Sequence, residues 1–262
     1  MNPIRKLLRL ILGLLSRLAI KRHKLELIVV AGWYGTSLAR EMLYTVLSDR
    51  LKVRRNTSEI WWDFSIPLAI LGYKDKRRNP FEWVLLIIRA TLYLFFGRYN
   101  PHVLILDADC TYNSTASYWA SFVKPDYLLV LNYEREAAVV RELVDSTDKK
   151  NATVIFNPET TSKSLVKKLK KHRTFTFGKE KGRSLTVKTN KKKIKIGYNQ
   201  KQIALPKSYL PSFSTDMLGG VFAVAVLKGL NLTEAGFNSL KFELPTKVVT
   251  KIRSKLEFNR LQ

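Results

Sequence analysis

The chain has 262 residues, of which 46% are hydrophobic, so it can form one large domain, or one with a small appendage, around a sizeable core. This composition excludes a protein that is disordered in bulk. Because 46 Lys and Arg residues outnumber 21 Asp and Glu residues, the formal net charge is +25 and the surface favours anionic partners. Nucleic acid, anionic lipid and phosphorylated precursors all meet this requirement.

Cysteine and histidine usage limits the chemistry further. The single cysteine, Cys110, excludes an internal disulfide and a thiolate metal cluster, which agrees with a reducing cytoplasmic location. Cys110 is either a packed, inert thiol, the interpretation we favour, or a nucleophile. The histidines His23, His102 and His172 lie far apart in sequence, so we expect no metal site from them.

Residues 1–24 are predicted to form a basic amphipathic helix on an anionic membrane surface. Leu and Ile recur at helical spacing from Ile4 to Ile20, and basic residues interleave with them. The longest uncharged run, Leu10 to Ser16, is too short to span a bilayer. The alternative is a helix docked on the protein's own core. The residues expected at the membrane surface are Arg5, Lys6, Arg9, Arg17, Lys21 and Arg22.

An apolar strand over residues 25–30 leads into a glycine-punctuated turn and an amphipathic helix, which is the pattern of a phosphate-binding loop. Gly32 and Gly35 stand three apart, and the Ser37 hydroxyl could serve Mg²⁺. Thr36, however, occupies the position where such loops carry a Lys. The alternative is an ordinary strand-turn-helix in which the glycines only allow a tight turn.

From about Leu25 to Pro245 the sequence resembles the central, ATP-binding domain of the Mur ligases. The nearest branch adds D-alanyl-D-alanine to the UDP-N-acetylmuramoyl tripeptide. The family's loop, T-G-[ST]-x-G-K-T-[ST]-[TA]-K-E, matches residues 31–41 without a gap. Its strand K-P-[DH]-x-[AG]-[VL]-[VI]-[TL]-N matches residues 124–132, the most specific match in the chain. We therefore expect a membrane-surface helix over 1–24, a Mur-ligase-like domain over 25–245 and a basic tail over 246–262.

The resemblance implies an α/β fold with a mostly parallel P-loop-type sheet flanked by helices. The continuous apolar run before Asp107 predicts a buried strand. Alternation over 184–188 and 193–197 predicts a small basic β-hairpin region, either a solvated lysine-rich face or a surface for anionic lipid or nucleic acid. Residues 81–96 are apolar nearly all round, which indicates a buried helix or a second interfacial helix.

The resemblance also assigns cofactor residues, with ATP and Mg²⁺ as the cofactors if binding is retained. Asp107 takes the place of a family Glu at a strand end, where a carboxylate suits Mg²⁺, with Ser37 as the second ligand. A strand-end Asp that caps the next turn is the alternative. Asn157 would contact the nucleotide, although a plain turn residue explains it equally well. The phosphate and nucleotide set is then Gly32, Gly35, Thr36, Ser37 and Asn157.

Several functional positions of the family are altered. The loop Lys has become Thr36, the active-site His has become Ala137, and a His-Asn pair has become Phe213-Ser214. We also expect the family's N- and C-terminal domains to be missing. Because amide ligation needs a gripped γ-phosphate and an amine held in line, these changes predict an inactive ligase-like protein.

The expected role is a membrane-surface scaffold or partner-binding protein in cell-wall synthesis. It would be cytoplasmic and peripheral to the inner face of the cell membrane. Its partners would be the anionic membrane and a peptidoglycan-synthesis protein or UDP-linked precursor. Two alternatives remain: a residual ATP-binding amide ligase, in which Arg40 or another basic residue replaces the Lys, and a basic nucleic-acid-binding module.

Overall fold

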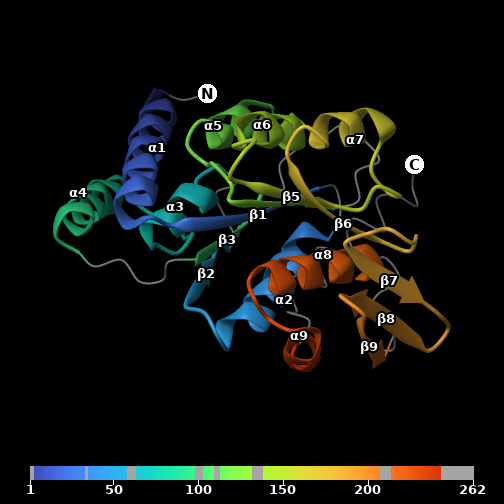
Figure 1. Ribbon diagram of the computed structural model, residues 1–262. Coiled ribbons are helices and arrows are strands. Elements are labelled where there is room, and N and C mark those ends of the chain that lie inside the picture. Colours follow the sequence, from blue (N-terminus) through green and yellow to red (C-terminus); the bar gives the residue numbers. More distant parts are fainter. Residues whose placement is uncertain are drawn as a thin grey trace, which may run out of the picture.

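A mostly parallel sheet organises the chain. The computed structural model describes residues 3–32, 35–57, 63–97, 103–108, 113–131, 138–206 and 214–242. Within these ranges the strands form one nine-stranded sheet in the order β2-β3-β1-β4-β5-β6-β7-β8-β9 (Figure 1). The strands are β1 (Glu26–Gly32), β2 (Val53–Arg55), β3 (Val103–Asp107), β4 (Tyr127–Leu131), β5 (Thr153–Phe156), β6 (Arg173–Gly178), β7 (Leu185–Thr189), β8 (Lys193–Tyr198) and β9 (Lys201–Pro206).

Helices cover both faces of this sheet, as Figure 1 shows. The helices are α1 (Pro3–His23), α2 (Thr36–Ser48), α3 (Ser65–Leu71), α4 (Pro80–Phe96), α5 (Asn113–Ala120), α6 (Ala138–Ser146), α7 (Lys163–Leu169), α8 (Ser214–Leu227) and α9 (Leu232–Leu240). One core contains residues of α1 and of α3 to α7, and the other contains residues of α2, α8 and α9. The predicted α/β fold with a mostly parallel sheet is therefore confirmed.

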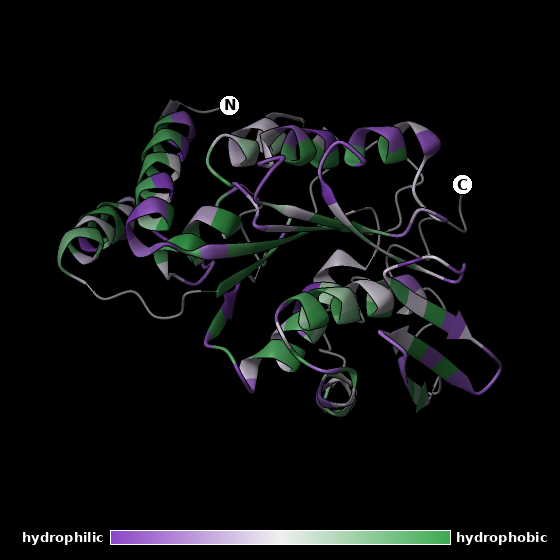
Figure 2. Cartoon of the chain, in the orientation of Figure 1, coloured by the Kyte–Doolittle hydropathy of each residue, from purple (hydrophilic) through white to green (hydrophobic). Residues whose placement is uncertain are grey.

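Strand β1 supplies side chains to both cores. Leu27, Val29 and Ala31 belong to the first core, whereas Ile28 and Val30 belong to the second. This alternation follows from the two-residue period of a strand. Because both faces of β1 are covered, residues 27–31 are all apolar. The hydropathy colouring shows the same two apolar layers on either side of the sheet (Figure 2).

The basic hairpin region forms the far edge of the sheet. Along the sheet from β2 to β7, β1 included, all neighbouring strands pair in parallel. The pairs β7–β8 and β8–β9 are antiparallel. Asn199 and Gln200, between β8 and β9, both have positive φ angles, of 45° and 64°. Two such residues are what a tight two-residue hairpin with the right twist requires.

Helix α4 is not the buried helix of the first prediction for this segment, because only one stripe of it is buried; the second prediction, an interfacial helix, stays a prediction. The helix begins with a capping box, in which the Asn79 side chain accepts from Glu82 N at 2.8 Å and the Glu82 carboxylate accepts from Asn79 N at 2.9 Å. Pro80 occupies the first turn. Four residues bury one stripe of the helix, namely Trp83, Leu86, Ala90 and Leu94.

Two boundaries were predicted incorrectly. The sequence Leu51-Lys52-Val53 predicts a short strand over 51–53, but β2 covers Val53–Arg55; the family match predicts a helix over 221–230, but α8 covers Ser214–Leu227. Helix α8 is buried on nearly all sides, so its sequence carries no amphipathic pattern that marks its start.

Asp126 in the Lys-Pro-Asp match ties three strands together. Its carboxylate accepts from Leu27 N at 2.8 Å, its own N–H donates to Leu27 O at 3.0 Å, and its carbonyl accepts from Thr153 N at 2.8 Å. Partial burial raises the pKa of Asp126, and the Leu27 hydrogen bond opposes that rise. The most specific sequence match therefore has a structural role at the start of the parallel sheet.

The Asp126→Asn variant should be slightly more stable than wild type at neutral pH. The amide oxygen can still accept from Leu27 N, while the partly buried charge is removed. Because the folded-state pKa lies above the unfolded value, the wild-type penalty is present at neutral pH and disappears as the pH falls below the unfolded pKa. Urea unfolding at pH 7 and pH 4 should show a gain below about 1 kcal/mol that shrinks at the lower pH.

Asp148→Asn is the matched control with the opposite sign. Hydrogen bonds from the backbone of Lys150 and from Asn151 lower the pKa of Asp148, so its contribution is present at neutral pH and is lost on acidification. This variant should lose stability at pH 7 and match wild type at acid pH. If the stability of both variants relative to wild type changed in the same direction with pH, the opposite pKa shifts of Asp126 and Asp148 would be contradicted.

Candidate functional site

The candidate site lies at the carboxyl ends of β1 and β3. Strands β1 and β3 are neighbours, and the chain leaves β1 towards β2 on one side of the pair but leaves β3 towards β4 on the other side. In open parallel sheets, ligands bind at such a switch point. The register places Val30 opposite Asp107 and Gly32 opposite Leu131, which brings the turn after β1 beside the end of β3.

The two loop glycines are required for different structural reasons. A Cβ on Gly32 would lie 2.1 Å from Leu131 O, because the two backbones approach closely there. Gly35 has a φ of 77° and caps α2 in the left-handed region, with open space around it. Thr36, in the position of the missing Lys, is buried. Trp33 and Tyr34 lie outside the described residues.

Ser37 and Asp107, the two predicted metal ligands, do meet. Ser37 Oγ donates to Asp107 Oδ2 at 2.5 Å. The guanidinium of Arg40 also reaches this oxygen, with Nη1 3.4 Å from Oδ2. The Asp107 side chain is fully buried and that of Arg40 is 8% exposed, so this ion pair is largely shielded from water.

Arg40 is shared with a second carboxylate, that of Glu41. Its Nε and Nη2 donate to Glu41 Oε1 at 3.0 Å and 2.7 Å. Arg55 donates through Nε to the same carboxylate at 2.8 to 2.9 Å, and its guanidinium lies 3.7 Å from the ring centroid of Tyr44. The two carboxylates and two guanidinium groups form a cluster without net formal charge. We call it the strand-end cluster; its members are Arg40, Glu41, Arg55 and Asp107.

Asn56 is a site residue that the sequence analysis missed. Its Nδ2 donates to Asp107 O at 3.1 Å, and its Oδ1 accepts from Asp107 N at 2.8 Å. Asn56 is buried at the end of the short strand β2 and holds the end of β3 in place. A polar residue directly after a strand was the available signal, but β2 was placed two residues too early to reveal it.

The residues present do not fit a magnesium site. A divalent cation needs several oxygen ligands, and the Oδ2 atom of Asp107 is already engaged by the Ser37 hydroxyl and by a cation, Arg40. The turn carries Thr36 where a phosphate-binding Lys is expected. Among the described residues, no group of three or more His, Cys, Asp or Glu side chains could hold a metal ion.

Asn157 belongs to a different cluster. Its Nδ2 donates to Asp216 at 2.6 Å, and its Oδ1 accepts from Glu159 N at 3.0 Å. Thr160 Oγ1 donates to the other Asp216 oxygen at 2.6 Å. Since β5 is three strands from β3, roughly 14 Å separates Asn157 from Asp107 across the sheet. The structure therefore does not join Asn157 to the turn after β1.

The predicted membrane-surface residues divide into two groups. Lys6 and Lys21 are exposed. The four arginines attach α1 to the rest of the protein: Arg5 to Asp63 at 2.8 and 2.9 Å, Arg9 to Ser114 O, Arg17 to Ser121 O at 2.5 Å, and Arg22 to Phe95 O at 2.8 Å. The hydrogen bond to Asp63 raises the pKa of Arg5. Helix α1 therefore packs on the protein's own core, and its outer face remains available.

Other predicted positions lie outside the described residues. These are His102, Cys110, Ala137, Phe213 and the tail over 246–262. Ser214 begins α8, but its side chain is not described.

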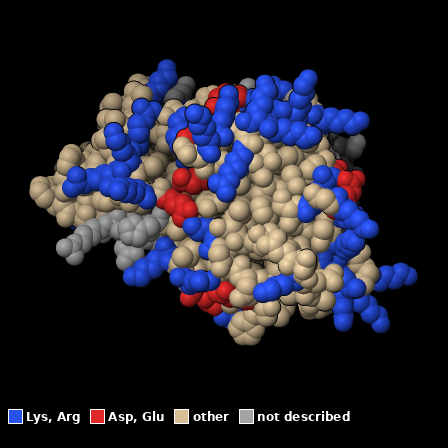
Figure 3. Space-filling view, in the orientation of Figure 1, with Lys and Arg blue, Asp and Glu red and all other residues tan. Residues whose placement is uncertain are grey.

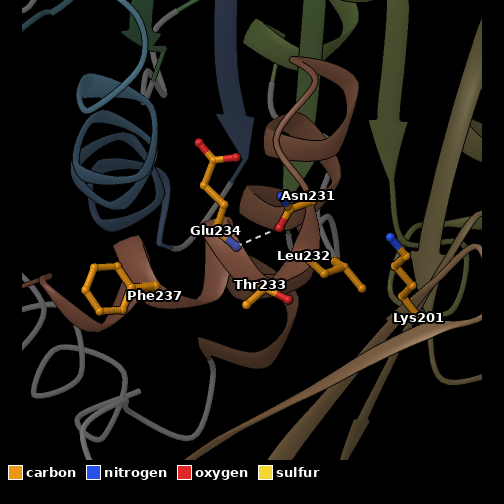
Figure 4. Close-up of a pocket in the computed structure, with 6 residues that line it drawn as sticks. All are labelled: Lys201, Asn231, Leu232, Thr233, Glu234 and Phe237. Carbon is orange, nitrogen blue, oxygen red and sulfur yellow. Dashed lines mark hydrogen bonds between the residues drawn. The ribbon is translucent and has the colours of Figure 1, made fainter.

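A pocket of about 570 Å³ lies between β9 and the start of α9 (Figure 4). Lys201 lines one side, and α9 supplies the other, where the Asn231 side chain accepts from Glu234 N at 2.9 Å. Phe237, which is on α9, also lines the pocket, and its side chain is 65% exposed. The lining includes none of the residues of the strand-end cluster.

The Gly32→Ala variant should be severely destabilised, because its Cβ would overlap Leu131 O and neither backbone can move without disturbing the sheet. We expect a loss of about 3 kcal/mol or more in the free energy of unfolding. Gly35→Ala meets no neighbour and should lose only about 1 to 2 kcal/mol from its left-handed backbone. Urea unfolding of both variants tests this order, and equal losses would contradict it.

Known proteins resemble the chain in structure rather than in sequence. MurF from Acinetobacter baumannii superposes with a TM-score of 0.69 at 14% identity, over 91% of this chain and 51% of that one. MurF from Thermotoga maritima, in complex with ADP, gives 0.64 at 14% identity, over 89% and 52%. FolC from E. coli, in complex with DHPP and ADP, gives 0.58 at 16% identity, over 90% and 61%.

The chain spans about half the length of these MurF structures. No protein-family model matches the sequence, and no curated protein sequence matches it. The structural agreement covers nearly the whole chain and includes the parallel sheet with its flanking helices. The chain therefore has a Mur-ligase-like central-domain fold, as the sequence resemblance predicts.

Proposed function

We propose that this chain is a Mur-ligase-like protein that lacks ligation chemistry and acts at an anionic membrane surface, as a scaffold or partner-binding protein in cell-wall synthesis. One observation carries the membrane part of the proposal. Helices α1 and α4 pack against each other and expose apolar side chains that no other described element covers. We call these side chains the α1/α4 surface.

The α1/α4 surface is large for a protein in water. Its members on α1 are Ile4, Leu7, Leu10, Leu14 and Leu18, and its members on α4 are Phe81, Val84, Ile88, Leu92, Tyr93, Phe95 and Phe96, each between 41% and 85% exposed. On each helix a separate stripe is buried in the core. Both helices are thus apolar on two sides, and exposed apolar patches of this kind mark contact sites.

Basic residues accompany this surface. Lys6, Arg17, Lys21 and Arg22 are exposed along α1 beside the leucines. Figure 3 shows Lys and Arg spread over the region of α1, with acidic residues confined to small groups. Apolar side chains beside basic ones match the boundary between acyl chains and anionic headgroups. No helix among the described residues combines the length and apolar character of a bilayer span.

The strand-end cluster supports the absence of ligation chemistry. An acyl-phosphate step needs a metal and a cation on the γ-phosphate, and removing such a clamp costs orders of magnitude in rate. Here Thr36 stands in place of the loop Lys, and Arg40 occupies the carboxylate expected to bind metal. A residual ligase would require both changes to be compensated. No described feature favours a nucleic-acid role beyond the general excess of positive charge.

Vesicle binding tests the membrane role. The double variant Leu10→Glu/Phe96→Glu replaces two exposed side chains, so folding should be unaffected. It should bind anionic phosphatidylglycerol vesicles about 100-fold more weakly than wild type, since each buried apolar side chain contributes about 1.5 kcal/mol or more. Phe237→Glu, at another exposed aromatic residue on α9, is the control and should bind like wild type.

The charge component has its own pair of variants. Lys6→Gln/Lys21→Gln should weaken binding to anionic vesicles roughly 30-fold, at about 1 kcal/mol for each lysine, and should have little effect at high salt. Lys191→Gln/Lys192→Gln removes two exposed lysines from the β7–β8 turn and should have little effect. The membrane role would be contradicted if wild type did not bind anionic vesicles. It would also be contradicted if the control variants weakened binding as much as the variants of α1 and α4.

Calorimetry tests the loss of nucleotide chemistry. Wild type should bind Mg-ATP more weakly than about 1 mM, because neither a loop Lys nor a free metal carboxylate is available. Thr36→Lys should not create magnesium dependence, since Arg40 still covers Asp107. Circular dichroism must show that this buried substitution folds. Tight magnesium-dependent ATP binding by wild type would overturn the degenerate-ligase proposal and leave the membrane proposal untouched.

A further inference from the structure

The cation at the strand ends is part of the chain itself. Arg40 contacts Asp107 Oδ2 at 3.4 Å and Glu41 Oε1 at 2.7 and 3.0 Å. Arg40 therefore bridges the two carboxylates of the cluster. We propose that Arg40 is a resident cation that replaces a divalent metal here, and that removing its side chain turns Ser37, Glu41 and Asp107 into a divalent-cation site.

Charge balance is the first argument. Asp107 and Glu41 contribute two negative charges, and Arg40 and Arg55 contribute two positive charges. These side chains are at most 29% exposed, and three of them are at most 11% exposed. Adding a divalent cation would leave an excess of two positive charges in a poorly hydrated place, which is unfavourable. Removing Arg40 leaves one net negative charge instead, which attracts a cation.

Geometry is the second argument. The Ser37 hydroxyl already lies at the Asp107 carboxylate, and Asn56 fixes the Asp107 backbone on both sides. Helix α2 places Ser37 and Glu41 four residues apart, on the same side of the helix. Hydroxyl and carboxylate oxygens are suitable ligands for Mg²⁺ and Mn²⁺. Without the guanidinium, oxygen atoms from α2 and β3 would face one vacated position.

Manganese titration tests the inference, with electron paramagnetic resonance to count bound Mn²⁺ and thermal unfolding as a second readout. Wild type should show no saturable site, and its unfolding midpoint should not change with Mn²⁺. Arg40→Ala should be less stable than wild type without metal, should bind one Mn²⁺ at least about 10-fold more tightly than any wild-type site, and should be stabilised by it.

Two variants separate the site from general charge loss. Arg55→Ala also removes a positive charge beside Glu41 but leaves Arg40 on Asp107, so it should gain no Mn²⁺ site. The double variant Arg40→Ala/Asp107→Asn should lose the site that Arg40→Ala gains. If Arg40→Ala does not fold, Arg40→Gln keeps the first three side-chain carbons and a hydrogen-bond donor without the charge, and it should gain the site as well.

Either of two results would overturn the proposal. The first is one saturable Mn²⁺ per wild-type chain, with affinity equal to that of the Arg40 variants. The second is a folded Arg40→Ala or Arg40→Gln protein without a gain in Mn²⁺ binding. Should neither variant fold, one saturable Mn²⁺ per wild-type chain overturns the resident-cation claim by itself, and the absence of a saturable site supports it. Vesicle binding does not enter this experiment, so its outcome is separate from that of the proposed membrane role.

Discussion

The double burial of β1 is the constraint on which the rest of the structure depends. Alternate side chains of this strand enter two different cores, so it must remain between β3 and β4 with both faces covered. Asp126 holds its first half through Leu27, and Lys228 pairs with Glu26 at 2.6 to 2.7 Å. At its far end, the backbone of Gly32 touches that of β4 so closely that a side chain has no room.

This constraint separates the shape of a phosphate-binding loop from its chemistry. Gly32 is required by contact with β4, and Gly35 by the left-handed entry into α2, whether or not an anion binds. The side chains that would hold phosphate and metal are not subject to the same packing demand. Thr36 is buried and Arg40 neutralises the strand-end carboxylates. Both glycines therefore have structural reasons that do not depend on nucleotide binding.

Local patterns were sufficient to predict most elements, whereas distant pairings were not. The apolar runs before Asp107 and Asn132 predicted β3 and β4, and alternation predicted β7 and β8. The contacts of Asn56 with Asp107 and of Arg9 with Ser114 join residues 51 and 105 positions apart, and no local periodicity encodes them. Asn157 follows β5, two strands from β1, and its contact with a nucleotide stays a prediction.

The attachment of α1 also has a kinetic consequence during synthesis. This helix is made before the residues that hold it, because its Arg9 and Arg17 bind carbonyls 105 and 104 residues later in the chain. At a synthesis rate of about 5 to 20 residues per second, roughly 5 to 20 seconds pass before those carbonyls exist. During that interval both apolar sides of α1 are uncovered. In a nascent chain, α1 therefore lacks its native contacts until those later residues have been made.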